Sequence, residues 1–128
     1  MSDAAGKTVQ NLGYHAHIYY DPEKTRAIAE RVCAAVDGKF RVEIDGFRDG
    51  PVGPHPVANA QVIFKPDQFQ PVVEWLVFHR DGLDVLIHPL SDDSVDDHSI
   101  YAMWLGTPVL LKLETLRRSY RAELLPRG

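Results

Sequence analysis

The sequence predicts a ferredoxin-like α+β sandwich, in which one antiparallel sheet carries two helices on the same face. Strand and helix patterns follow the order βαββαβ between residues 14 and 88. The two halves share one plan, since each has a strand, a helix that begins at a proline and ends at an Asp-Gly pair, and a second strand. The 128 residues, 45% hydrophobic and 25% charged, match one globular domain.

The first half begins with an alternating, aromatic-rich segment at Tyr14–Tyr20, which predicts a strand. Asp21-Pro22 supplies an N-cap followed by a proline at the first helical position. Apolar residues then recur every four positions, so we expect a helix over 22–36 that Gly38 ends. Residues 40–45 alternate apolar and charged side chains, as in a strand with one solvated face.

The second half follows a connection rich in glycine and proline over residues 46–56. Residues 60–64 predict the third strand. A second helix begins at Pro66, carries an apolar stripe at helical spacing and ends at Gly82. Residues 84–88 predict the fourth strand. Right-handed crossovers then place the first strand between the third and the fourth, and leave one face of the sheet bare.

The pattern weakens after the fourth strand. Residues 89–98 form an acidic loop, and alternation over 111–114 predicts a fifth strand or an extended arm. We therefore divide the chain into a flexible N-terminal leader over 1–12, a ferredoxin-like domain over 13–108 and a C-terminal arm of that domain over 109–128, with a solvated, arginine-rich end.

Composition excludes several classes of protein. The net charge of −4 and the scattered basic residues argue against nucleic acid as the main partner. No apolar run reaches the roughly 20 residues of a membrane helix, so we expect no membrane partner. The polar N-terminus lacks the apolar centre of a secretory signal, which predicts a cytoplasmic protein. The single cysteine, Cys33, excludes an internal disulfide and a cysteine-built metal site.

Six histidines are the informative residue type, and three of them share one predicted face. Side chains alternate along a strand, so if Ala16 and Ile18 lie under the helices, His15 and His17 lie on the bare face. The same parity sends His88 to that face, together with Gln61 of the third strand. Since the first and fourth strands are neighbours about 4.8 Å apart, the three imidazoles are expected to converge. Neutral imidazole is a good ligand for iron, zinc and copper.

Two more histidines, His55 in the Gly/Pro-rich loop and His98 in the acidic loop, can fold over the same face. His79 is interpreted instead as a partner of the second helix dipole. Glu43 has the correct parity but lies two strands from the first, on the order of 10 Å away. We therefore expect coordination by histidines alone or with a carboxylate of Asp92–Asp97.

Four motifs in this order resemble the DOPA 4,5-dioxygenase family in its small bacterial and fungal form, over about residues 12–108. They are Tyr14-His-Ala-His-Ile-Tyr-Tyr20, Gly53-Pro-His-Pro56, Leu86-Ile-His-Pro89, and Asp97-His98 followed by Trp104-Leu-Gly106. The resemblance implies an enzyme that opens the ring of a catechol such as L-DOPA by extradiol cleavage, with dioxygen and non-haem Fe(II). Leu90-Ser-Asp-Asp93 departs from the Asn-Thr-Gly-Asp type of turn expected there, which bears on loop shape and substrate choice.

The resemblance and the parity together give a hypothesis for each site residue. The metal ligands are His15, His17 and His88, and zinc is a possible substitute for Fe(II) in purified protein. The acid–base or substrate-contacting histidines are His55 and His98, and an exchange between these two groups of histidines stays open. The expected substrate contacts are Gln61, Tyr101 and Trp104, with Arg41 or Arg48 for a substrate carboxylate. A homodimer is expected from the bare face of the sheet.

Two other functions remain open at this stage. The first is a non-catalytic ferredoxin-like dimer that binds a small ligand, with its histidines as ordinary interface residues. The second is a different metal-dependent enzyme, because imidazole ligands do not select iron. Metal analysis together with oxygen uptake on a panel of catechols separates these alternatives from the dioxygenase.

Overall fold

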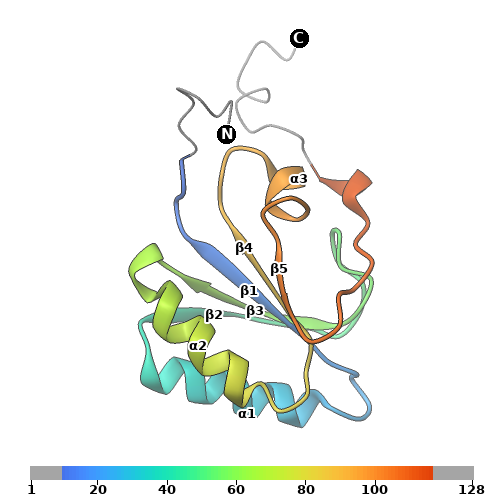
Figure 1. Ribbon diagram of the computed structural model, residues 1–128. Helices are drawn as coiled ribbons and strands as arrows, with labels where there is room; N and C mark the ends of the chain where they lie inside the picture. Colours follow the sequence, from blue (N-terminus) through green and yellow to red (C-terminus); the bar gives the residue numbers. More distant parts are fainter. Residues whose placement is uncertain (1–9, 117–128) are drawn as a thin grey trace.

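The protein is a five-stranded antiparallel sheet with helices, seen in a computed structural model that describes residues 10–116 (Figure 1). The sheet has the order β2-β3-β1-β4-β5. The strands are β1 (Tyr14–Tyr19), β2 (Val42–Arg48), β3 (Asn59–Phe64), β4 (Val85–Pro89) and β5 (Met103–Leu105). The helices are α1 (Arg26–Lys39), α2 (Phe69–His79) and the short α3 (Ser94–Asp97), with 3₁₀ turns at Pro66–Gln68 and Leu113–Thr115. The predicted ferredoxin-like order and the central position of β1 are confirmed.

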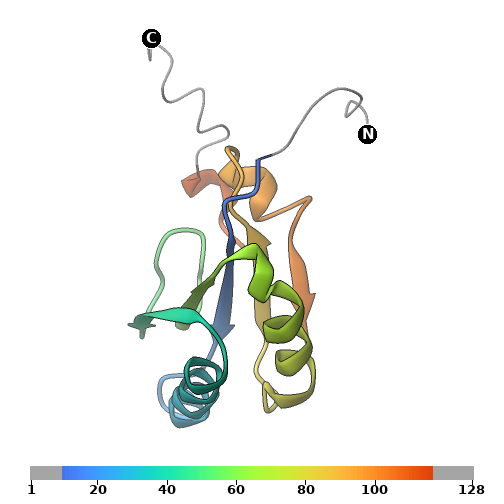
Figure 2. The same cartoon turned by 90° about the vertical axis from the view of Figure 1, so that its left-hand side faces the viewer.

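The helices α1 and α2 lie side by side on one face of the sheet, where the hydrophobic core forms (Figure 2). Ala16, Ile18 and Ile87 point into this core and are completely buried. Val36 of α1 and Leu76 of α2 meet them from the helical side. The predicted parity of the strands is therefore confirmed, and the histidines at odd positions of β1 face away from the helices.

The opposite face of the sheet is not bare. The connection over residues 49–58 and the segments before and after β5, over residues 90–100 and 106–116, lie on that side, away from α1 and α2 (Figure 1). The backbone N–H of Lys112 donates to the carbonyl of Pro54 at 2.8 Å and ties the two segments together. The expectation of an uncovered face is thus corrected, and the homodimer based on it stays a prediction.

The first helix begins and ends later than the sequence pattern indicates. Residues 22–25 form a turn, in which the Asp21 carboxylate accepts from the N–H of Glu23 and the Asp21 N–H donates to the Thr25 hydroxyl. Gly38 lies inside α1 and does not end it. The chain becomes extended at Phe40, whose side chain packs against the core. The second helix ends at His79, and the predicted stop at Asp81 and Gly82 is a turn directly after it, with positive φ angles of 55° and 84°.

The fifth strand lies at Met103–Leu105 and not at residues 111–114. It pairs with β4, and Leu86 lies opposite Trp104. Met103 and Leu105 pack against the core, and this burial selects the earlier apolar segment. No helix within residues 10–116 is long and apolar enough to cross a bilayer. The predictions for most of the leader and for the arginine-rich end fall outside the described residues.

Candidate metal centre

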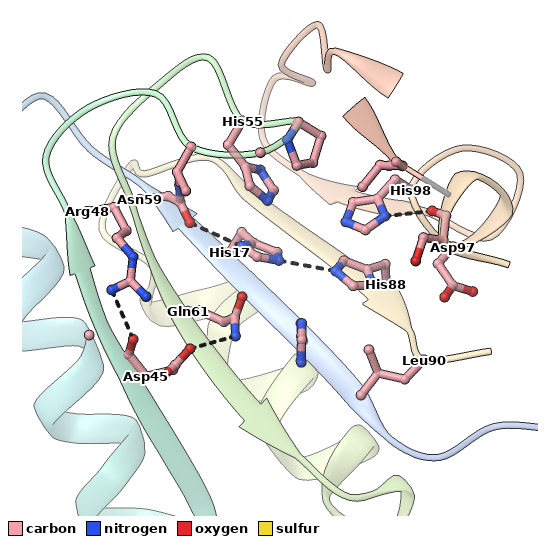
Figure 3. Close-up of a pocket in the computed structure, with 17 residues that line it drawn as sticks. His17, Asp45, Arg48, His55, Asn59, Gln61, His88, Leu90, Asp97 and His98 are labelled. Carbon is pink, nitrogen blue, oxygen red and sulfur yellow. Dashed lines mark hydrogen bonds between the residues drawn. The ribbon is translucent and has the colours of Figure 1, made fainter. Parts of the chain in front are cut away.

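Five imidazole rings gather in one place on the face of the sheet opposite α1 and α2 (Figure 3). The strand β1 contributes His15 and His17, and β4 contributes His88 directly opposite His15. His55 comes from the connection before β3, and His98 follows α3. Ring centroids are 4.1 Å apart for His17 and His55, and 4.0 Å apart for His88 and His98. The predicted convergence of the strand histidines is thus present, with both loop histidines added to it.

Hydrogen bonds at Nδ1 orient the two central rings. The Nδ1–H of His17 donates to Oδ1 of Asn59 at 3.1 Å, and the Asn59 amide nitrogen donates to the Val57 carbonyl. The Nδ1–H of His88 donates to the Pro89 carbonyl at 2.8 Å. In both rings Nδ1 then carries the proton, because its partner is an oxygen that only accepts. Each Nε2 is left with a lone pair, the arrangement typical of metal-ligating histidines.

The two lone pairs point at each other. The Nε2 atoms of His17 and His88 are 3.1 Å apart, and both rings are buried. A neutral pair of acceptors at this distance is unfavourable unless a cation or a proton lies at the same point. Two overlapping groups of three donors, all within 4.8 Å of one another, surround it: His15, His17 and His88, and His17, His55 and His98. The donor set therefore fits a metal that accepts nitrogen ligands.

Burial keeps all five imidazoles neutral near pH 7. Burial is the first cause that lowers the pKa of His17 and His88 well below the ordinary 6.5, and neighbouring histidines add to it. Burial and the charge of His98 lower the pKa of His15 and His55 to about 4, although Asp45 acts in the opposite direction on His15. Burial also lowers the pKa of His98. Neutral imidazoles present the lone pairs that a metal needs, since protons compete with metals for these nitrogens.

A cavity of about 320 Å³ opens beside the rings and is lined by residues of all these segments. This volume lies at the small end of ligand sites and suits a molecule with one aromatic ring. At its outer edge a β-bulge between Ile44 and Phe47 shifts the register of β2. Asp45 and Arg48, three positions apart, therefore both line the cavity, although in a regular strand they would face opposite sides.

Three residues were expected to contact substrate, and the structure separates them. Gln61 lines the cavity and donates to the Asp45 carboxylate at 3.0 Å. Trp104 lies beyond the cavity and stacks on Tyr19, with ring centroids 6.0 Å apart. Tyr101 is partly exposed in a different depression, beside Tyr14. Neither Tyr101 nor Trp104 is among the cavity-lining residues. Pairing with Leu86 of β4 holds Trp104 at the edge of the sheet.

No carboxylate belongs to either group of possible ligands within the described residues. Both oxygens of Asp97 accept hydrogen bonds from Ser91, which fold the acidic loop over the site. Burial raises the pKa of Asp97, against the effect of these hydrogen bonds. Glu43 lies beside a separate depression, on the far side of β3. The candidate ligand sets consist of histidine alone.

Sequence reasoning missed the residues that support this centre. Asn59 and Tyr19 are buried, and each forms a hydrogen bond with a histidine. Strand parity would have identified both, since Asn59 lies two positions before Gln61 and Tyr19 two positions after His17. Parity did not indicate Arg48, because the bulge before it is not visible in the sequence pattern.

The Dopa 4,5-dioxygenase family model matches residues 14–115 of this chain, and so spans the sheet and every histidine of the centre. The chain belongs to the Dopa 4,5-dioxygenase family. A DOPA 4,5-dioxygenase from Amanita muscaria is 30% identical over 80% of this chain and 49% of its own length. An uncharacterized 21.2 kDa protein from Botryotinia fuckeliana is 33% identical over 82% of this chain and 63% of its own.

A solved structure extends the family match to the fold. The crystal structure of a "putative dioxygenase" from Nostoc punctiforme superposes with a TM-score of 0.79 and 43% identity, over 82% of this chain and 90% of that one. The chain spans about half to two thirds of the length of the two curated relatives. The chain therefore shares the family and the fold of these proteins, and its histidine centre could hold a metal ion.

Proposed function

We propose that this protein is a dioxygenase that opens the ring of a catechol with a carboxylate-bearing side chain, such as L-DOPA, by extradiol cleavage with Fe(II) and dioxygen. The observation that carries the proposal is the facing pair of Nε2 atoms of His17 and His88, 3.1 Å apart in a buried ring cluster. Family membership supplies the reaction class. The cavity beside the cluster gives room for one aromatic ring.

The proposed iron ligands are His15, His17 and His88. Two of them are held in place by the Asn59 amide and the Pro89 carbonyl, and all three are carried by paired strands, which hold ligands more rigidly than loops do. When bound, Fe(II) supplies the redox chemistry that lets dioxygen react with an electron-rich ring. Three protein ligands leave coordination positions open for the reactants.

The proposed acid–base residues are His55 and His98. A catechol loses protons when it binds a metal, and ring opening returns a proton to the product, so the site needs groups that hold and release protons. Both rings lie against the proposed ligands, His55 over His17 and His98 over His88. Both are partly enclosed by the loops that cover the sheet, which limits access of water to the reacting ring.

The outer edge of the cavity is proposed to bind the side chain of the substrate. Arg48 lines it and forms no ion pair within residues 10–116, so its charge is available for a carboxylate. The Asp45 carboxylate beside it suits an ammonium group. Arg41, the other candidate, lies outside the cavity and pairs with Asp67 at 2.9 Å. This arrangement favours an aromatic amino acid over a plain catechol.

Oxygen uptake tests the proposal. Protein purified without oxygen and loaded with Fe(II) should consume oxygen with L-DOPA and form a yellow product, whereas zinc-loaded protein should not. The variant His79→Gln should consume oxygen as the wild type does, because His79 stacks on Trp75 at the end of α2, away from the centre. No oxygen uptake with any catechol from iron-loaded, folded protein would reject the dioxygenase and leave a different metal-dependent reaction.

A further inference from the structure

We infer that Tyr19 is a positioning residue that makes His55 the hydrogen-bond donor of the cavity and keeps it out of metal coordination. The inference rests on the proposed function. It gives different roles to His55 and His98, which occupy equivalent places in one group of possible ligands. His55 belongs to one of the two possible groups of ligands, with His17 and His98. The tautomer of its ring decides whether it can serve in that group.

Three rings of the cluster share one tautomer. The Nδ1 atoms of His17 and His88 face the Asn59 and Pro89 oxygens, and Nδ1 of His98 lies 2.7 Å from the Ser94 carbonyl oxygen. These oxygens only accept, so each Nδ1 carries the proton. In all three rings Nε2 therefore holds a lone pair, which can bind a metal or accept a proton.

His55 differs because its Nδ1 meets a hydroxyl. The oxygen of Tyr19 lies 2.7 Å from this nitrogen, and Tyr19 is 3% exposed. Nδ1 of His55 is the one hydrogen-bond partner of the Tyr19 hydroxyl within residues 10–116. A buried hydroxyl proton needs an acceptor, so the phenol donates and Nδ1 is the acceptor. The ring proton of neutral His55 then lies on Nε2.

The phenol is held in the orientation that this hydrogen bond needs. Its ring stacks on Trp104 with an angle of 19° between the planes, and the Tyr19 backbone N–H donates to the Asp84 carbonyl at 3.0 Å. Tyr19 also lies two positions after His17 on β1, so both side chains are on the same face of the sheet. The packing of Trp104, which contributes nothing to the cavity wall, thus acts on the site through Tyr19 and His55.

The polarity of His55 separates the two groups of ligands. A nitrogen that carries a proton cannot bind a metal, so His55 donates a hydrogen bond to an oxygen of a ligand in the cavity. In Figure 3 its ring extends from the loop toward His17. The metal then falls to His15, His17 and His88, and His98 is left with a lone pair as the proton acceptor.

Nitrogen-15 NMR of the histidine rings, recorded on metal-free protein at pH 7.5, tests the tautomer directly. Wild-type His55 should show a protonated Nε2 and a bare Nδ1, whereas His98, which is not part of the facing His17 and His88 pair, should show the reverse. The variant Tyr19→Phe should turn His55 into a mixture of tautomers. The control Tyr20→Phe also removes a buried phenol, but one that donates to Asp49, and should leave the His55 signals unchanged. A wild-type His55 protonated at Nδ1 would overturn the inference.

Zinc affinity provides a second test that needs no turnover, and so separates this inference from the proposed reaction. The variant His17→Gln should weaken zinc binding by more than about 100-fold, since losing a direct ligand costs more than losing a residue that orients one. The variant His55→Gln should bind zinc as the wild type does. Equal weakening in the two variants would place His55 among the ligands and reject the assignment, and it would decide the question even if Tyr19→Phe failed to fold.

Discussion

Acidification should destabilise the metal-free protein through its neutral histidines. The pKa of His55 is lowered from 6.5 to about 4, mainly by burial. The unfolded chain therefore takes up a proton near pH 6.5, and the folded chain takes it up only near pH 4. The contribution of His55 to the free energy of unfolding is therefore complete above pH 6.5 and is lost as the pH falls toward 4.

The size of the effect follows from the same two values. At about 1.4 kcal/mol for each tenfold change in an equilibrium constant, His55 alone accounts for about 2 kcal/mol lost by pH 5 and about 3 kcal/mol by pH 4. His15, with a pKa of about 4, acts in the same direction. These losses are a large part of the roughly 5–15 kcal/mol that stabilises an ordinary domain.

Urea unfolding with a chelator present, followed by tryptophan fluorescence between pH 7.5 and 4.5, measures this loss. His55→Gln should reduce the slope of unfolding free energy against pH by about 1.1 kcal/mol per pH unit between pH 4.5 and 6. His79→Gln, outside the cluster, should keep the wild-type slope. The comparison of slopes is needed because acid also protonates carboxylates. A wild-type free energy of unfolding that stays constant from pH 7.5 to 5 would refute the burial of neutral imidazoles.

Three further outcomes are expected. Zinc at 100 times its dissociation constant should raise the free energy of unfolding by about 2.7 kcal/mol, a chelator should reverse this, and His88→Gln should abolish the gain in a thermal melt. Asn59→Leu should release the His17 ring and weaken zinc binding by about 10–100-fold in competition titrations. The control Gln70→Leu, on the exposed side of α2, should bind zinc as the wild type does. Equal zinc affinities of Asn59→Leu and the wild type would contradict the orienting role of Asn59. Arg48→Gln should raise KM for L-DOPA by about tenfold or more, because a charged hydrogen bond contributes about 1.5–3 kcal/mol. The KM for 4-methylcatechol, which has no carboxylate, should not change, and neither KM should change in the matched control Arg41→Gln. An equal effect of Arg48→Gln on the KM of both substrates would argue against carboxylate binding.

Local patterns predicted most of the fold because each pattern has a local cause. Alternation along β1 and β4 reflects the pleat of a strand, and it correctly placed Ala16 and Ile87 in the core. The ends of the helices were less predictable. Gly38 adopts the helical conformation without steric conflict, and α1 ends where Phe40 packs against the core. Burial against the core likewise decides the position of β5, because Met103 and Leu105 pack there.

The sequence by itself determined that His15, His17 and His88 share one face beside one another, because strand order and side-chain parity follow from short-range rules. Only the tertiary structure decided what surrounds them. The loops that carry His55 and His98, the bulge that turns Arg48 into the cavity and the hydrogen bonds of Asn59 and Tyr19 all join residues distant along the chain. Such contacts form when the segments pack together, and no local periodicity encodes them.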